Sequence, residues 1–378
     1  MKVILFHNTL PAYRIPFYNA LAKLVELKIV LFNLESTEAI YGEKSKPALL
    51  KGCRQVIIDK SKDVRKQVKD EISEGADIVH LPTPDGKYEL YVTNLCLHFA
   101  RKKGIKTALY WIRWTPDLSQ IPVKQIGKNV IRNILAGGIA RKADVCIYSG
   151  VKSREQFKRL RVRDDHLMPM HYSTDVYQDA EDCDIYEKYG IRDGLKLILY
   201  FGRVIERKGL LYLIRAYEML NEAEVQLVVA GSGTEYFEEC KKYVEENHVR
   251  NVLFLGLVPS VERKNFFENA DLFVLPSVLD HGITEPWGQT VNESFQCGCR
   301  VVASDAVGAA YELIRPENGA MYPAEDVQAL ADIMKGLLRT DYDRDKIKST
   351  ISEYTCENMA EDMLRAYDMA LLETDGAL

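Results

Sequence analysis

The sequence lacks features that mark several classes of protein. It has no run of about eighteen apolar residues, so we expect no membrane-spanning helix. The apolar start, Val3–Phe6, is too short for a signal peptide and is better explained as a strand. Of the eight cysteines only Cys297 and Cys299 stand close together, which makes a poor metal site. Reduced cysteines and a cytoplasmic location are therefore expected.

Glycine is missing from the loop that follows the first expected strand. This loop, residues 7–16, reads HNTLPAYRIP. A dinucleotide-binding domain would carry G-x-G-x-x-G at this place. A nicotinamide or flavin enzyme is therefore disfavoured.

Composition and periodicity indicate a large α/β protein. With 378 residues, 47% apolar and 28% charged, the chain can bury a sizeable core and divide into two domains. Strand-like runs alternate with helical patterns, which favours parallel sheets. The expected strands are 3–6, 28–32, 76–81, 106–111, 144–148, 196–201, 226–230, 251–257, 272–275 and 301–303. The expected helices are 16–25, one beginning at 153, 210–220, one beginning at Pro286 and stopped by Gly298, 327–338 and 359–372.

Positive charge is concentrated in residues 101–163. This segment has sixteen basic and three acidic residues, a net charge of +13, which leaves −18 for the rest of the chain. Within it, residues 123–140 combine basic residues with an apolar stripe. The stripe consists of Ile126, Val130, Ile134 and Leu135. The pattern suits either an amphipathic helix on anionic lipid or a core helix with a solvated basic face. Nucleic acid is disfavoured because no recognition motif accompanies the charge.

Two carboxylates stand out in the stretch from residue 271 to 304. An apolar strand precedes a long loop, and the expected helix contains Glu285 near its start and Glu293 further on. At ~1.5 Å per residue, about 12 Å of helical rise would separate them. In a doubly wound sheet such a loop faces a ligand, so we expect 285–290 to do so. The alternative is a helix-terminal charge at Glu285 and a solvated Glu293.

Two cations follow the first strand of the second half. Gly202 permits a tight turn, and Arg203 and Lys208 flank the junction of this loop with the next helix. Fixed cations suit a diphosphate leaving group, whose charge grows as its bond to sugar breaks. The alternative is a pair of surface charges.

These two segments resemble known motifs. Residues 285–294, EPWGQTVNES, resemble the E-P-x-G-x-x-x-x-E-A signature of the retaining, nucleotide-sugar-dependent glycosyltransferases of family 4, also called group 1, and depart from it at Ser294. Residues 202–209 resemble the G-R-x-x-x-x-K-G string of that family, and residues 142–157 resemble it more loosely. At 170–175 the family's P-N-G-V-D is replaced by MHYSTD, so no contacts are carried over there.

The resemblance implies the GT-B fold, in which two Rossmann-like doubly wound parallel-sheet domains face each other across a cleft. The N-terminal domain, 1–178, would bind the acceptor, and 179–354 would bind the nucleotide sugar. The final helix, 355–378, would pack back onto the first domain.

The resemblance also assigns roles on the donor side. Arg203 and Lys208 would hold the donor phosphates, Glu285 would contact hydroxyls of the transferred sugar, and Glu293 would hold the ribose. The donor-binding residues are then Gly202, Gly231, Gly233, Val258, Gly288, Gln289, Thr290 and Glu293. Retention of configuration in this family needs no protein nucleophile, because the leaving phosphate takes the acceptor proton.

Four residues are candidates for the acceptor side. Some polysaccharide-synthesis transferases carry a P-x-Y-R-x-P-x-x-x-x-L loop like that of Tyr13 and Arg14, although Arg14 could equally be a surface charge. His80, at a strand end, suits an acid or base or a hydrogen-bonded rim residue. Arg113 lies between two tryptophans that could stack on a sugar or fill the core. By analogy the acceptor is a glycan or lipid-linked intermediate of bacterial cell-surface glycan synthesis, met at the inner face of the membrane.

We predict no metal and no cofactor beyond the donor. The D-x-D motif of metal-dependent transferases is matched by Asp182–Asp184 and Asp341–Asp343, which we interpret as solvated. A nucleotide-sugar epimerase and a non-catalytic sugar-nucleotide-binding module are the alternative functions.

Overall fold

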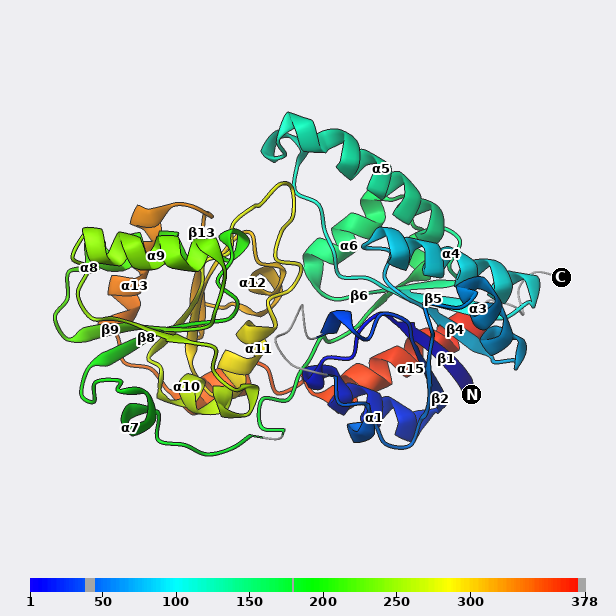
Figure 1. Cartoon of the computed structure of the whole chain (residues 1–378), viewed down its shortest axis with the longest axis horizontal. Coiled ribbons are helices and arrows are strands. Elements are labelled where there is room, and N and C mark those ends of the chain that lie inside the picture. Colours follow the sequence, from blue (N-terminus) through cyan, green and yellow to red (C-terminus); the bar gives the residue numbers. More distant parts are fainter. Residues whose placement is uncertain (38–44, 179, 373–378) are drawn as a thin grey trace. The chain divides into compact units, whose positions relative to one another are not determined.

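The chain folds into two compact α/β units (Figure 1). The computed structural model describes residues 1–37, 45–178 and 180–372. Unit 1 comprises Met1–Ile112, Gly127–Thr174 and Glu353–Leu378, and unit 2 comprises Arg113–Ile126 and Asp175–Ser352. The largest difference from the sequence-based bounds is the segment Arg113–Ile126, which belongs to unit 2 and not to the predicted N-terminal domain.

Unit 1 contains a parallel sheet of seven strands in the order β3-β2-β1-β4-β5-β6-β7. The strands are β1 (Lys2–His7), β2 (Glu26–Leu31), β3 (Arg54–Ile57), β4 (Ile78–Leu81), β5 (Lys106–Tyr110), β6 (Val145–Tyr148) and β7 (Leu167–Pro169). The central strands are nearly continuous apolar runs, because helices cover both faces of a parallel sheet. In register, Leu5 lies between Ile29 of β2 and His80 of β4.

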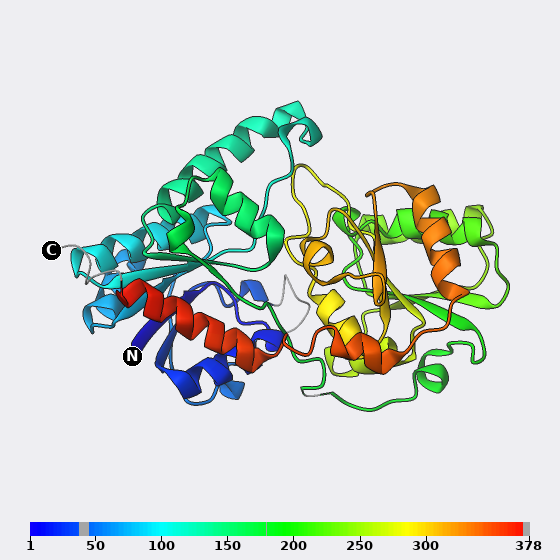
Figure 2. The ribbon, with the colours of Figure 1, turned by 180° about the vertical axis from the view of Figure 1, so that it is seen from behind.

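Helices cover both faces of this sheet. They are η1 (Ala12–Arg14), α1 (Ile15–Leu24), η2 (Pro47–Leu49), α3 (Val64–Ser73), α4 (Lys87–Lys102), α5 (Val123–Ala140), α6 (Gly150–Arg159), η4 (Asp164–His166) and α15 (Cys356–Leu372). Figure 2 shows the last helix, α15, lying beside α1. On the other face a buried cluster that includes Phe6, Phe32, Trp111 and Phe157 packs under α3, α4 and α6. Trp111 is thus a core residue.

Unit 2 contains a parallel sheet of six strands in the order β10-β9-β8-β11-β12-β13. The strands are β8 (Lys196–Phe201), β9 (Val225–Ala230), β10 (Val252–Gly256), β11 (Leu272–Leu275), β12 (Arg300–Ser304) and β13 (Gly319–Tyr322). The helices are η3 (Leu118–Gln120), α7 (Ile185–Tyr189), η5 (Glu206–Lys208), α8 (Leu210–Leu220), α9 (Glu235–Glu246), η6 (Ser260–Glu262), α10 (Arg263–Asn269), α11 (Gln289–Gln296), α12 (Gly308–Leu313), α13 (Val327–Leu338) and α14 (Arg344–Ser349). The predicted α/β class with two parallel sheets is therefore confirmed.

The strand order of unit 2 determines where a ligand can bind. The first strand, β8, lies between β9 and β11, so the strand order reverses between β8 and β11. The loops that leave these two neighbouring strands turn to opposite faces of the sheet and leave a crevice between them. Unit 1 has the same arrangement at β1 and β4.

Among the helices of the described residues, none combines the length and the apolar content needed to cross a bilayer.

Candidate functional site

Two loops of unit 2 pack against each other at the carboxyl ends of β8 and β11. Val278 of the second loop donates a backbone hydrogen bond to the carbonyl of Arg207 in the first, at 2.8 Å. Gly209 has a φ of +68°, and a Cβ there would lie 1.9 Å from the carbonyl oxygen of Pro276. Glycine is therefore required where the first loop meets the second.

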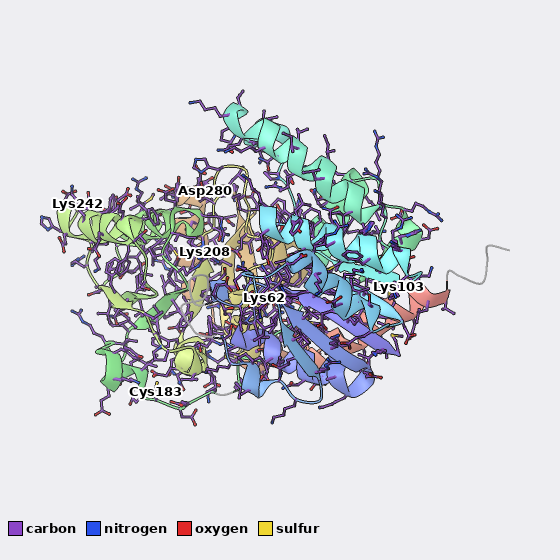
Figure 3. The ribbon with its side chains drawn as sticks, turned by 45° about the vertical axis from the view of Figure 1, so that its right-hand side comes forward. Lys62, Lys103, Cys183, Lys208, Lys242 and Asp280 are labelled. Carbon is purple, nitrogen blue, oxygen red and sulfur yellow. The ribbon has the colours of Figure 1, made fainter. Side chains whose placement is uncertain are left out.

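A buried carboxylate joins these loops. Glu285, which is 9% exposed, pairs with Lys208 (Oε2 to Nζ, 2.8 Å) and with Arg207. Burial would raise the pKa of Glu285, but the charges of Lys208 and Arg207 outweigh it and lower this pKa to about 2. Burial lowers the pKa of Lys208, and Glu285 opposes this effect. Figure 3 shows Lys208 within unit 2, whereas Lys242 lies on its outer helix layer.

Only one of the two cations that the sequence grouped together forms an ion pair with Glu285 in the structure. Lys208 contacts Glu285, whereas the side chain of Arg203 is exposed. The Tyr200 hydroxyl donates a hydrogen bond to the carbonyl of Arg203 at 2.7 Å. Arg207 takes the position beside Glu285 instead. Sequence reasoning missed Arg207, although it stands directly before Lys208 in the same loop.

The predicted start of the helix at Pro286 is wrong. Helix α11 begins at Gln289, after Gly288, whose φ of +95° a helix cannot accommodate. The backbone of Glu285 instead donates to Ala306 and accepts from Gly308, both at 3.0 Å. These tertiary hydrogen bonds hold the segment extended, so the predicted helical rise between Glu285 and Glu293 does not apply. Glu285 is a loop residue rather than a helix-terminal charge.

The start of α11 presents polar groups without partners. Both amide atoms of Gln289 and the hydroxyl of Thr290 are shielded from solvent and form no hydrogen bond. The first turn of a helix also has backbone N–H groups that lack intrahelical acceptors. Buried polar groups without partners usually indicate a missing ligand or water. These groups could bind a polar or anionic ligand, so the expectation that residues 285–290 face a ligand stays a prediction.

Glu293 is buried one turn further along α11. It is 3% exposed, and its carboxylate lies 3.4 Å from Nη1 of Arg263. Burial raises the pKa of Glu293, and Arg263 opposes the rise. The alternative of a solvated Glu293 is therefore wrong. The charge of Arg263 does not offset the effect of burial on the pKa of Glu293, whereas the charges of Lys208 and Arg207 do so for Glu285.

The remaining donor-side residues lie in loops after β8, β9 and β10. A Cβ on Gly231 would lie 1.8 Å from the carbonyl oxygen of Gly202, and one on Gly233 would lie 2.0 Å from that of Val204. Val258, after β10, is buried. Bridges join Val204 to Gly233 and Gly231 to Gly256, so the three loops form one layer.

The acceptor candidates do not all lie in one unit. Tyr13, Arg14 and His80 belong to unit 1, whereas Arg113 belongs to unit 2. Arg14 is 8% exposed, so the alternative of a surface charge is wrong. His80 is buried rather than at a rim, and its Nδ1 lies 3.0 Å from the hydroxyl of Tyr367, so only the hydrogen-bonded part of that alternative is confirmed.

The D-x-D carboxylates serve the fold. Asp184 caps α7 by accepting from two backbone N–H groups, and Asp343 caps α14 in the same way. Asp182 pairs with Lys264. Within the described part of the chain, no group of three or more His, Cys, Asp or Glu side chains could hold a metal ion.

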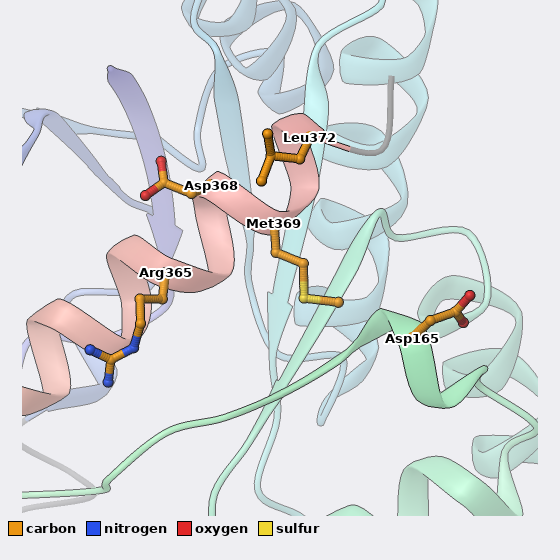
Figure 4. Close-up of a pocket in the computed structure, with 5 residues that line it drawn as sticks. All are labelled: Asp165, Arg365, Asp368, Met369 and Leu372. Carbon is orange, nitrogen blue, oxygen red and sulfur yellow. The ribbon is translucent and has the colours of Figure 1, made fainter. Parts of the chain in front are cut away.

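Two surface cavities in unit 1 lie away from the predicted residues. One of about 450 Å³ lies beside α15 (Figure 4). It is lined by Asp165, Arg365, Asp368, Met369 and Leu372. The other, of about 720 Å³, is lined mainly by α4 and carries several basic side chains. These are Arg65, Arg101, Lys102 and Lys142.

Comparison with known proteins bears on unit 2 in particular. Residues 183–353 match the family described as glycosyl transferases group 1. An uncharacterized glycosyltransferase of Methanocaldococcus jannaschii is 31% identical over 200 residues, 50% of this chain and 49% of the relative. The phosphatidyl-myo-inositol mannosyltransferase of Mycobacterium leprae is 31% identical over 208 residues, 53% of this chain and 52% of the relative. The chain thus spans about half the length of these curated relatives.

A solved structure extends the likeness of fold to the whole chain. Anabaena HepE in complex with UDP and glucose matches with a TM-score of 0.69 and 18% identity, over 100% of both chains. The two parallel-sheet units and this match give the fold as GT-B. The segment that matches the glycosyl transferases group 1 family, residues 183–353, contains both motifs on which the resemblance was based, at 202–209 and 285–294.

Proposed function

We propose that the protein is a retaining glycosyltransferase that moves a sugar from a nucleotide-diphosphate sugar to an acceptor hydroxyl. The observation that carries the proposal is the buried cluster in which Lys208 and Arg207 meet Glu285 where the strand order reverses. This is the expected place for a ligand in a doubly wound sheet. The family of residues 183–353 supports the same reaction.

In this reaction the bond between the sugar's anomeric carbon and the donor phosphate breaks, and the acceptor oxygen bonds to that carbon. The acceptor's proton passes to the leaving phosphate. Lys208 and Arg203 stabilise the negative charge that develops on the diphosphate. Lys208 is held in place by its ion pair with Glu285, so it needs no reorganisation as this charge develops. Glu285, ionised at neutral pH, accepts hydrogen bonds from sugar hydroxyls and acts as a positioning group.

The nucleotide lies along the start of α11 and the glycine loops. Gln289 and Thr290, with Gly288, face the sugar and phosphates, and their unpartnered polar atoms support this. Glu293 accepts hydrogen bonds from the ribose hydroxyls. The backbone near Val258, and Gly202, Gly231 and Gly233, approach the nucleotide closely.

We further propose that transfer needs no metal ion. Of the D-x-D carboxylates that would bind one, Asp184 and Asp343 instead cap α7 and α14, and Asp182 pairs with Lys264. Lys208, Arg207 and Arg203 already place positive charge at the β8 loop, where a metal would otherwise be needed to neutralise the diphosphate.

The acceptor in this proposal is a lipid-linked or polysaccharide intermediate of bacterial cell-surface glycan synthesis, met on the cytoplasmic face of the membrane. The name of the Mycobacterium leprae relative, a phosphatidyl-myo-inositol mannosyltransferase, supports a lipid acceptor. Tyr13, Arg14 and His80 of unit 1, with Arg113, are the proposed acceptor residues. No nucleic acid partner is proposed.

Helix α5 supports contact with anionic lipid. Four of its apolar side chains are 40–63% exposed, and the helix contains no acidic residue. They are Val130, Ile131, Ile134 and Leu135. Because the exposed Lys124 and Lys128 belong to the same helix, this face suits a negatively charged bilayer.

Vesicle sedimentation tests this contact. The protein should bind vesicles of phosphatidylglycerol and phosphatidylcholine, and an Ile131→Ser, Ile134→Ser double variant should bind them less. The matched control is Met219→Ser, which changes a side chain on α8 that is 49% exposed. Equal binding of all three proteins would count against a membrane role for α5.

Thermal unfolding with a panel of UDP-, GDP- and dTDP-sugars tests the donor site. A ligand at about a hundred times its dissociation constant adds about 2.7 kcal/mol to the free energy of unfolding. One member of the panel should stabilise the protein, and Lys208→Ala should remove this effect. Incubation of that donor without acceptor separates a transferase from an epimerase, since only the epimerase would convert the sugar nucleotide.

A further inference from the structure

The ligand-binding edge of unit 1 contains a buried arginine. Arg14 follows β1 in η1, at the place in the unit 1 sheet that corresponds to the β8 loop of unit 2. It is 8% exposed, although arginine is almost never fully buried unless it is paired.

Aromatic rings rather than carboxylates surround this guanidinium. Its Cζ lies 4.4 Å from the ring centre of Tyr172, 5.7 Å from that of Tyr13 and 5.8 Å from that of Tyr110. Its Nη2 donates a hydrogen bond to the Tyr172 hydroxyl at 2.8 Å. Among the described residues, no Asp or Glu forms an ion pair with Arg14.

The guanidinium still has donor capacity that a ligand can use. The hydrogen bond to Tyr172 uses one of the five N–H donors of a guanidinium. A planar guanidinium held on aromatic faces presents a fixed fork of donors, which matches the two oxygens of a phosphate or carboxylate.

The two neighbouring histidines, His7 and His80, add no charge to the surroundings of Arg14. Burial and the charge of Arg14 lower the pKa of His7 to about 4. Burial, His7 and Arg14 lower the pKa of His80 to about 3. Both imidazoles are therefore neutral at physiological pH. The site holds one buried positive charge, neutral hydrogen-bonding groups and tyrosine hydroxyls.

We propose that Arg14 binds an oxyanion of the acceptor, so that the acceptor carries a phosphate or a carboxylate close to the hydroxyl that receives the sugar. This inference rests on the proposed function and names the chemical class of the acceptor. Tyr172 orients the guanidinium, and the rings of Tyr13 and Tyr110 form the walls of the site.

Titration calorimetry with inorganic phosphate and with glucuronate tests the site and separates the two oxyanions. The Lys208→Ala variant serves as the background, because phosphate would otherwise also meet the cations of unit 2. In this background, Arg14→Gln should weaken binding of one of the two anions by about tenfold or more. The matched control is Arg215→Gln, an exposed arginine whose Cζ lies 5.3 Å from the ring centre of Tyr243. It should leave binding unchanged.

A second variant covers the case in which Arg14→Gln does not fold. Tyr172→Phe keeps the ring but removes the hydroxyl that holds the guanidinium, and should weaken the same anion several-fold. A purely structural role for Arg14 predicts a different result. Arg14→Gln would then lower the melting temperature, and Tyr172→Phe would bind both anions as tightly as the Lys208→Ala variant does. That result, or equal anion binding by all variants, would overturn the proposal.

The sugar-nucleotide panel separates this inference from the proposed function. With Lys208 intact, Arg14→Gln should keep the stabilisation by the donor that the wild-type protein shows. A panel without any response would refute the donor site and leave the Arg14 result standing. A normal panel with anion binding independent of Arg14 would refute only the acceptor inference.

Discussion

The charge cluster around Glu285 gives a quantitative prediction. Glu285→Gln keeps the shape of the side chain and removes the charge that pairs with Lys208 and Arg207. A pKa lowered from 4.5 to about 2 corresponds to about 3 kcal/mol, at about 1.4 kcal/mol per pKa unit. Because Glu285 is 9% exposed, solvent screens little of this interaction. The variant should lose up to about 3 kcal/mol of stability at pH 7.

The pH dependence gives the sign of the effect. The folded-state pKa of Glu285 lies below the unfolded value, so its contribution is fully present above about pH 4.5 and is lost as the pH falls towards 2. The difference between wild type and Glu285→Gln should therefore be constant from pH 5 to 8 and shrink below pH 4.5.

Urea unfolding followed by circular dichroism measures the difference in the free energy of unfolding, and thermal unfolding measures the corresponding difference in Tm. In a domain of 150–250 residues, about 3 kcal/mol corresponds to a fall in Tm of roughly 6–12 °C. The control is Glu238→Gln, which breaks an ion pair with Lys241 at 3.3 Å on the surface of α9. With side chains 70% and 36% exposed, that pair should contribute less than about 1 kcal/mol. Equal losses in the two variants, or a difference that does not change with pH, would refute the reasoning.

Further predictions concern the same loops. Lys208→Ala should lower turnover at saturating donor by roughly a hundredfold, as expected for the loss of one charge-stabilising donor, and an unchanged rate would exclude its role. Glu293→Gln should stabilise the ligand-free protein above about pH 4.5, because burial raises the folded-state pKa of Glu293. The same variant should weaken nucleotide binding. Thermal unfolding with and without the donor measures both effects. Gly209→Ala should cost about 2 kcal/mol or more, because a Cβ there meets the carbonyl of Pro276, and chemical unfolding would show it. Transfer should persist in EDTA, and a loss restored by added magnesium would contradict the proposal of a metal-free reaction.

Helices that depend on local signals were predictable from the sequence. The bounds expected for α8 and α13, 210–220 and 327–338, agree with the structure. Gly209, in the left-handed region, precedes α8, and Asp326 caps α13 by accepting from the backbone of Ala329. In each case a residue next to the helix sets the boundary, so the sequence contains the signal.

Elements and contacts that depend on tertiary partners were not predictable. Pro286 is a favoured first helical residue, yet hydrogen bonds with the loop after β12 keep its neighbour Glu285 extended. Strands β3 and β13 have only four residues each, which is too short for a periodic signal to mark them. Spacing could place two cations in the loop after β8, but only the packing of that loop against the next decides that Arg207, rather than Arg203, meets the carboxylate.

The ion pairs of Glu285 also affect which molecules the crevice at the carboxyl ends of β8 and β11 attracts. With its own carboxylate in place, the cluster with Lys208 and Arg207 carries a net charge of one rather than two. A small inorganic anion therefore meets one net positive charge there rather than two. Under the proposed function, a sugar nucleotide would have an advantage over such an anion, because its hydroxyl groups would bind Glu285 while its phosphates bind the cations. The carboxylate of Glu285 would then make recognition depend on both halves of the donor.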